Sequence, residues 1–203
     1  MAIELYGIPG SGKTTLIQKI RPPDAPSYSG GDGVRGAALN VVKKAVVFLP
    51  SSLRYKAEIR KIIGGQADGP RYVKKSLSAH LDSIVMLAFG YRRLRGKTFL
   101  DEGIIHRTIT LAINYNIGAD RVPLILDVLR DSMKDVESYY LKASVDECFR
   151  SIRKRNRHIC EMDELDDERL LEFLKQYESY CEAVREKCRS GIVTRENYGE
   201  LMT

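Results

Sequence analysis

A glycine-rich segment near the N-terminus has the residue types and spacing of a phosphate-binding loop. Gly7-Ile-Pro-Gly-Ser-Gly12-Lys13-Thr14 matches G-x-x-x-x-G-K-[ST] at every defined position. Glycines let the backbone curl around phosphates with its N–H groups inward, the lysine reaches the β- and γ-phosphates, and the threonine offers its hydroxyl to Mg²⁺. The segment therefore predicts a nucleoside triphosphate site, with these binding residues: Gly7, Gly10, Ser11, Gly12, Lys13, Thr14 and Thr15.

Two acids directly follow another short apolar run. Thr98-Phe-Leu has the composition of a strand, and Asp101 and Glu102 come next. An acid at the end of a parallel strand lies at the sheet edge where phosphates bind, so it can anchor a metal there. We expect Asp101 to hold Mg²⁺ together with Thr14. We expect Glu102 to act as a general base or as a contact to a second substrate.

A basic run later in the chain is a candidate cover for the phosphates. It holds five cations within eight residues, and seven acids follow it between Glu161 and Glu172. Most charge runs are solvated helix faces. This run, however, follows a capping box at Ser144–Glu147, and its charges are segregated by sign. Because a guanidinium binds two oxygens and stays charged, we expect Arg155 and Arg157 to act on the transferring phosphate.

Three further charged residues are candidate contacts to a second substrate. Asp32 and Arg35 belong to a glycine-rich turn, Ser-Gly-Gly-Asp-Gly-Val-Arg, and Arg107 lies about one helical turn past Glu102. Between positions 51 and 97 the chain carries eleven Lys or Arg residues against three Asp or Glu. An acidic acceptor would find cations in this part of the chain, although a solvated face is the ordinary interpretation for most of them.

Composition restricts the class of protein further. The chain has 203 residues, 43% of them apolar, and a formal net charge of +6, which suits one α/β domain with anionic ligands. No apolar run reaches the roughly 20 residues of a membrane span, and the N-terminus lacks the pattern of a signal peptide. The four cysteines form no C-x-x-C pair, so we expect neither disulfides nor zinc, and a cytoplasmic location.

The hydrophobic pattern alternates between strands and helices, which predicts a parallel sheet covered by helices. Expected strands cover residues 2–6, 27–29, 98–101, 136–141 and 192–195. Expected helices cover residues 13–20, 34–48, 51–63, 70–94, 104–115, 120–129, 144–157 and 166–189. We interpret residues 1–203 as a single domain with a helical insertion at about 34–97 and a lid at about 150–165.

The order of these parts resembles that of the P-loop kinases of nucleosides and nucleotides, the adenylate, thymidylate and deoxynucleoside kinases. The loop at Gly7–Thr14 matches their phosphate loop. The turn at 29–35 is similar to the S-T-G-D-x-x-R turn of adenylate-type kinases. The run from Cys148 to Arg157 looks like the C-x-x-R-[IL]-x-x-R-x-R lid of deoxynucleoside kinases, except that Ser151 stands at the first lid arginine, which Arg150 would replace from one position earlier.

The resemblance implies a three-layer α/β sandwich with a five-stranded parallel sheet in the order 2-3-1-4-5, a helical acceptor lobe and a lid. It also implies a kinase that uses Mg²⁺ and ATP for in-line transfer of the γ-phosphoryl to a small-molecule acceptor, nucleoside- or nucleotide-like. Glu102 is not followed by the R-S of deoxynucleoside kinases, and no D-G-x-P-R follows Asp101. These departures leave a nucleotide, a sugar, a lipid or another small molecule as the acceptor.

Two other classes remain open from the sequence. Viral-type helicases also pair G-x-P-G-S-G-K with an Asp-Glu strand end, which would make the protein a nucleic-acid-stimulated ATPase. A helicase core needs two such domains, and no G-D-x-x-Q follows a later strand, so the kinase interpretation is favoured. A nucleotide-binding switch without an acceptor is the third class. Transfer products would separate these classes.

Overall fold

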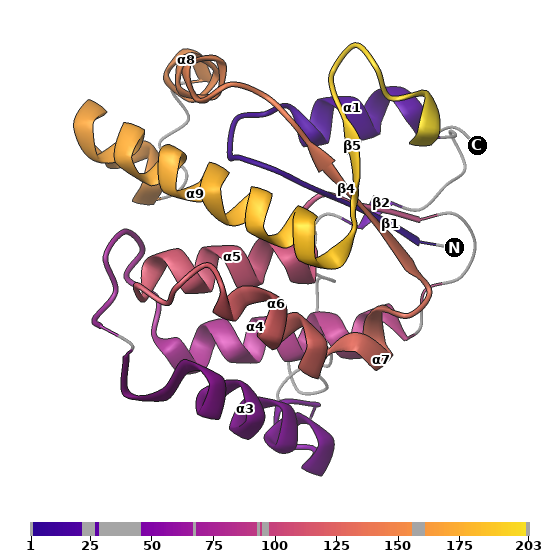
Figure 1. Ribbon diagram of the computed structural model, residues 1–203, viewed down its shortest axis with the longest axis vertical. Coiled ribbons are helices and arrows are strands. Elements are labelled where there is room, and N and C mark those ends of the chain that lie inside the picture. Colours follow the sequence, from indigo (N-terminus) through magenta and orange to yellow (C-terminus); the bar gives the residue numbers. More distant parts are fainter. Residues whose placement is uncertain are drawn as a thin grey trace, which may run out of the picture.

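One parallel sheet organises the protein (Figure 1). The computed structural model describes residues 2–21, 27–28, 46–66, 68–92, 94, 98–155 and 161–201. Within these residues, five strands pair in parallel in the order β2-β3-β1-β4-β5, which is the order that the resemblance implies. The strands are β1 (Ala2–Tyr6), β2 (Ser27–Tyr28), β3 (Thr98–Leu100), β4 (Val136–Leu141) and β5 (Gly191–Val193).

Helices cover both faces of the sheet, as the alternating pattern predicts (Figure 1). One face carries α1 (Lys13–Ile20) and the C-terminal turn η3 (Gly199–Leu201). The other described helices lie on the other side of the sheet or at its end. They are α3 (Pro50–Ile63), α4 (Leu77–Tyr91), α5 (Ile104–Asn114), α6 (Arg121–Val128), α7 (Arg130–Met133), α8 (Val145–Arg155) and α9 (Asp167–Cys188), with short turns η1 (Gly64–Gln66) and η2 (Glu161–Glu164).

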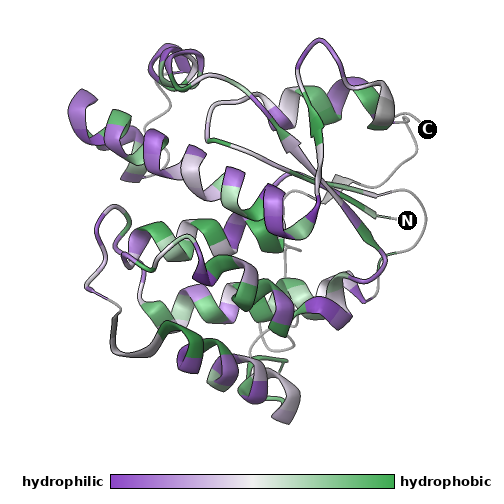
Figure 2. Ribbon diagram, in the orientation of Figure 1, coloured by the Kyte–Doolittle hydropathy of each residue, from purple (hydrophilic) through white to green (hydrophobic). Residues whose placement is uncertain are grey.

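Two hydrophobic clusters follow from the alternation of side chains along β1. Ile3 and Leu5 pack with Leu16 and Ile17 of α1 on one face. Ala2 and Tyr6 point to the opposite face, into the larger cluster that joins α4, α5, α6 and α9. Figure 2 shows this distribution, with apolar colour along α4 and α5 and polar colour on the outer sides of α3, α8 and α9. The strand that leads into the phosphate loop is thus held from both sides.

The expected helix at 70–94 is wrong in its first turns, because α4 begins only at Leu77. The side chain of Asn114, at the end of α5, takes the hydrogen bonds that a helix would need. Its Oδ1 accepts from the backbone N–H groups of Tyr72 and Val73, both at 2.9 Å, and its Nδ2 donates to the Val73 carbonyl at 2.9 Å. Ser76 then caps α4 by accepting from the Ala79 N–H at 3.2 Å.

Most other elements lie within one or two residues of their expected bounds. The capping box is present, since the Ser144 N–H donates to Glu147 and the Glu147 N–H donates back to the Ser144 hydroxyl, each at 3.3 Å. The expected helix at 34–48 falls almost wholly outside the described residues. Of the helices that the structure describes, none combines the length and apolar character needed to cross a membrane.

Candidate functional site

The phosphate loop occupies the turn between β1 and α1. Gly10 and Gly12 have φ values of 87° and 95°, in the left-handed region that favours glycine. A Cβ atom on Gly10 would lie 2.6 Å from the backbone carbonyl oxygen of Cys148 on α8. Since neither backbone can yield, only glycine fits at this position. The loop is therefore packed against the helix that carries the basic run.

Lys13 is folded back onto its own loop. Its Nζ donates to the carbonyl oxygens of Gly7 at 2.8 Å and Ile8 at 3.1 Å. The side chain is buried, and this burial lowers the pKa of the ammonium group. A polyphosphate bound in the loop would offset that loss of hydration with its own negative charge. The ammonium thus lies against the carbonyl groups of the loop that precedes α1.

The two residues expected to hold metal are in direct contact. The Thr14 hydroxyl donates to Asp101 Oδ2 at 2.9 Å, which joins the start of α1 to the end of β3. Asp101 is 8% exposed, and its second oxygen, Oδ1, is buried without a hydrogen-bond partner among the described residues. A buried carboxylate oxygen without a donor is costly unless a cation or a water meets it. The pair therefore fits a divalent cation beside the phosphate loop.

Glu102 and Arg107 form an ion pair on the same side of the site. Arg107 Nη2 lies 2.6 Å from Glu102 Oε2, and the Glu102 side chain is 45% exposed. His106, one residue before Arg107, lies against α9. Burial, assisted by the positive charges of Lys13 and Arg107, lowers the pKa of its ring well below the usual value. Its Nδ1 lies 2.8 Å from the Tyr177 hydroxyl.

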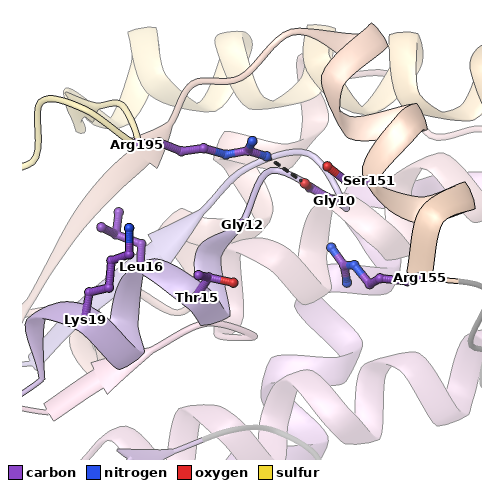
Figure 3. A pocket seen from close by; sticks show the side chains of 8 residues that line it. All are labelled: Gly10, Gly12, Thr15, Leu16, Lys19, Ser151, Arg155 and Arg195. Atoms are coloured by element: carbon purple, nitrogen blue, oxygen red, sulfur yellow. Dashed lines mark hydrogen bonds between the residues drawn. The ribbon is translucent and has the colours of Figure 1, made fainter.

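A pocket of about 250 Å³ opens beside the loop (Figure 3). Its lining residues come from the loop, from α1, from α8 and from the segment after β5: Gly10, Gly12, Thr15, Leu16, Lys19, Ser151, Arg155 and Arg195. Three of them are cations and none is an acid, so the pocket suits an anionic or electron-rich ligand. Arg155, expected from the sequence to act on phosphate, is among them.

Arg195 is a part of this site that the sequence did not predict. Its Nε donates to the Ser11 carbonyl oxygen at 2.6 Å. Its Nη2 donates to the Gly10 carbonyl oxygen at 3.0 Å (Figure 3). The guanidinium thus ties the phosphate loop to the far end of the chain, 184 positions away. No local pattern around Arg195 signals this contact, which depends on β5 lying beside β4.

The structure brings only some of the expected residues together. All the loop residues, Asp101, Glu102 and Arg107 surround the junction of β1, β3, α1 and α5. Ser151, rather than the exposed Arg150, lines the pocket, which does not support Arg150 as a replacement for the first lid arginine. Asp32, Arg35 and Arg157 lie outside the described residues, so their roles stay predictions.

Comparison with known proteins identifies the fold and nothing finer. The chain is similar in structure to deoxyadenosine kinase from M. mycoides, with a TM-score of 0.53 and 14% identity over 96% of this chain and 88% of that one. A gluconokinase from Sinorhizobium meliloti 1021 aligns with a TM-score of 0.45 and 17% identity over 99% and 86% of the two chains. No family model matches the sequence. No curated protein matches it either. The chain shares its fold with that deoxyadenosine kinase, as the order of the motifs implied.

Proposed function

We propose that the protein is a phosphotransferase that moves the γ-phosphoryl group of ATP to a small-molecule acceptor. The observation that carries this proposal is the contact between Thr14 and Asp101 beside a complete phosphate loop. The fold shared with deoxyadenosine kinase supports it independently of any single residue.

We propose a single domain, 1–203, with acceptor-binding helices at about 34–97 and a lid at about 150–165.

The donor would bind with its phosphates in the loop. The loop N–H groups and the positive N-terminus of α1 face the same anion, and Lys13 neutralises the β- and γ-phosphates. The pocket beside Gly10, with Thr15, Arg155 and Arg195 on its walls, would take the rest of the nucleotide. Cations on several walls suit a ligand that carries phosphates and an aromatic base.

Mg²⁺ is the cofactor that the residues fit. Thr14 and Asp101 would hold it, with the unpartnered Oδ1 of Asp101 as the oxygen that meets the ion or its water. The described residues contain no group of three or more His, Cys, Asp or Glu placed to hold a metal. Phosphate oxygens and water would therefore supply most of the ligands. The bound ion would neutralise charge on the β- and γ-phosphates.

Positioning and charge neutralisation would supply most of the rate, since phosphoryl transfer needs little covalent chemistry from the protein. Lys13 would hold the transferring group, and Arg155 with Arg157 would close over it. Glu102 would accept the proton of the acceptor hydroxyl or bind the acceptor directly. The Glu102 carboxylate forms an ion pair with Arg107 at 2.6 Å, so both side chains would adjoin the same acceptor.

The acceptor we propose is nucleoside- or nucleotide-like. The structure of the M. mycoides enzyme holds dCMP and dCDP as bound products, and this chain shares its fold. Asp32, Arg35 and Arg107 are the proposed acceptor contacts. Of these, Arg107 lies beside Glu102, which follows the end of β3. Phosphorylation of a nucleoside panel and of a nucleoside monophosphate panel with γ-labelled ATP identifies the acceptor.

We expect Arg155→Ala to lower kcat more than it raises KM for ATP, because its guanidinium would meet charge that redistributes only in the transition state. A loss of about tenfold to a hundredfold in kcat is the expected size. Arg157→Ala should behave alike. Arg150→Ala is the matched control, since Arg150 is an exposed arginine of the same helix. An effect of Arg155→Ala confined to KM for ATP would contradict this role. So would a kcat for Arg155→Ala no lower than that of Arg150→Ala. Either result would indicate that the basic run is a solvated helix face.

Stimulation by nucleic acid separates this proposal from an ATPase. ATP turnover is measured alone, with nucleosides and nucleotides, and with single-stranded RNA or DNA. We expect an acceptor to raise the rate of ATP consumption, with one phosphorylated acceptor formed for each ATP consumed. We expect single-stranded nucleic acid to leave that rate unchanged. Phosphate release that rises with single-stranded nucleic acid and leaves every acceptor unmodified would identify an ATPase instead.

A further inference from the structure

A carboxylate lies buried in the middle of the sheet, on the strand that leads into the phosphate loop. Glu4 is fully buried, and its neighbours in register are Leu100 on β3 and Ser138 on β4. It points to the same face as Ala2 and Tyr6, toward α4 and α5. Burying a charge there is costly unless hydrogen bonds compensate, so its partners are informative.

The partners of Glu4 are the first N–H groups of α5. Glu4 Oε1 accepts from the backbone N–H of Ile105 at 2.8 Å and of His106 at 3.3 Å. Glu4 Oε2 accepts from the Tyr91 hydroxyl at 2.8 Å, and the same hydroxyl accepts from the Ile104 N–H at 3.0 Å. A helix leaves its first N–H groups without intrahelical partners. Here a side chain from β1 and another from α4 satisfy three of them.

Gly103 shows that this arrangement replaces an ordinary cap. It is the N-cap residue of α5 and has no side chain to bond the helix. A Cβ atom built on Gly103 would lie 2.0 Å from the Tyr91 hydroxyl and 2.2 Å from Glu4 Cδ. The carboxylate and the hydroxyl thus occupy the space that the side chain of a capping serine or aspartate would need.

The residues held in this way adjoin the proposed metal and acceptor contacts. Only Asp101, Glu102 and Gly103 separate the end of β3 from the start of α5. The sheet fixes one end of this turn, and Glu4 with Tyr91 fixes the other. The orientation of the Asp101 carboxylate toward the Thr14 hydroxyl therefore depends on the position of the first residues of α5.

We propose that Glu4 is a positioning residue for the turn Asp101–Gly103: its carboxylate, with the Tyr91 hydroxyl, sets the start of α5 and so aims Asp101 and Glu102 at the phosphate loop. The inference rests on the proposed function for what the turn does, and on the contacts above for how it is held. An ionised carboxylate at a helix N-terminus also interacts favourably with the helix dipole, which strengthens the hold.

Protonation of Glu4 would weaken that hold in the neutral range. Burial raises its pKa from the ordinary value of 4.5 to about 7, opposed by the hydrogen bonds from Tyr91 and from the α5 backbone. The titratable groups facing it are Tyr91 on α4, His106 on α5, whose ring burial keeps neutral, and Tyr6 on its own strand. Ser138 and Leu100, on the flanking strands, do not titrate in this range.

Two quantities should therefore change in opposite directions with pH. Because the pKa is raised in the folded state, the proton contributes stability that is fully present below pH about 4.5 and is lost as the pH rises through about 7. The ionised form, however, holds the turn better, so Mg²⁺-dependent nucleotide binding and transfer should improve through the same range. If Glu4 only filled space in the core, its ionisation would change the stability with pH but not the Mg²⁺-dependent binding of nucleotide.

The test compares Glu4→Gln, which keeps the shape and removes the charge, with Glu137→Gln on β4, an exposed carboxylate one ladder position away. We expect Glu4→Gln to lower kcat about tenfold and to lose the pH step near 7 in both activity and unfolding free energy. The Mg²⁺ concentration for half-maximal binding of a non-hydrolysable ATP analogue, measured by calorimetry, should rise about fivefold or more. Glu137→Gln should match the wild type in all three.

Tyr91→Phe is the second variant, since it removes only the hydroxyl that joins Glu4 to Ile104. It should shift the Mg²⁺ dependence in the same direction and by less. The calorimetric measurement needs no acceptor, so it decides the inference even where no transfer is found and the proposed function fails. A Glu4→Gln protein with wild-type Mg²⁺ dependence and an unchanged pH step would show that Glu4 has no positioning role.

Discussion

Replacing Lys13 by alanine should abolish phosphate transfer and leave a folded protein. The ammonium lies within 3.1 Å of two loop carbonyl oxygens, and we expect it to neutralise the β- and γ-phosphates. Loss of a charge aimed at the transferring group should cost more than about 100-fold in kcat. Binding of ATP should weaken strongly as well, because the interaction also exists in the ground state.

The experiment measures transfer by labelled ATP, ATP affinity by calorimetry and folding by circular dichroism. Lys61→Ala, an exposed lysine on α3, is the control for loss of a positive charge and should behave as wild type. Unchanged turnover in a folded Lys13→Ala protein would falsify the assignment of the phosphate loop.

We expect Asp101→Asn to slow transfer by about 100-fold or more and to weaken the Mg²⁺ dependence, while nucleotide still binds. The carboxylate is buried, one oxygen meets Thr14 at 2.9 Å, and the other has no partner among the described residues. An amide keeps the contact to Thr14 but is a poor metal ligand. The loss should therefore appear in Mg²⁺ titrations rather than in stability.

Two comparisons make the Asp101 result specific. Asp131→Asn, an exposed carboxylate on α7, should change neither rate nor Mg²⁺ titration. Glu102→Gln should reduce the rate without changing the Mg²⁺ dependence, as expected of a base or an acceptor contact. A normal Mg²⁺ titration and rate for Asp101→Asn would place the metal elsewhere in the protein.

The features that could be predicted from the sequence are formed by residues that are adjacent in the chain. The phosphate loop is a local motif, and the position of Asp101 after β3 follows from parallel strands ending at one edge. The capping box at Ser144–Glu147 was recognisable for the same reason. Local spacing was sufficient wherever the physical cause of a structure is itself local.

The parts that the sequence missed depend on distant partners. The stretch before Leu77 has a helical pattern, yet the Asn114 side chain takes its backbone hydrogen bonds from 41 positions away. The sequence assigns no role to Glu4, because its helix partners begin 101 positions later. The contact of Arg195 with the phosphate loop is likewise not predictable from local sequence, because it depends on the pairing of β5 with β4. Such contacts become visible only when the sheet is assembled.

The central claim is that this loop and Asp101 together transfer a phosphoryl group to an acceptor. The measurement that tests it most directly follows γ-³²P from ATP and Mg²⁺ into nucleosides, nucleoside monophosphates and sugars, with Lys13→Ala and Asp101→Asn in parallel. We predict label in one acceptor class for the wild type, in amounts equal to the ADP formed, and none for either variant. ATP consumption that yields only free phosphate across the whole panel, or labelled acceptor that persists in the Lys13→Ala protein, would contradict the account.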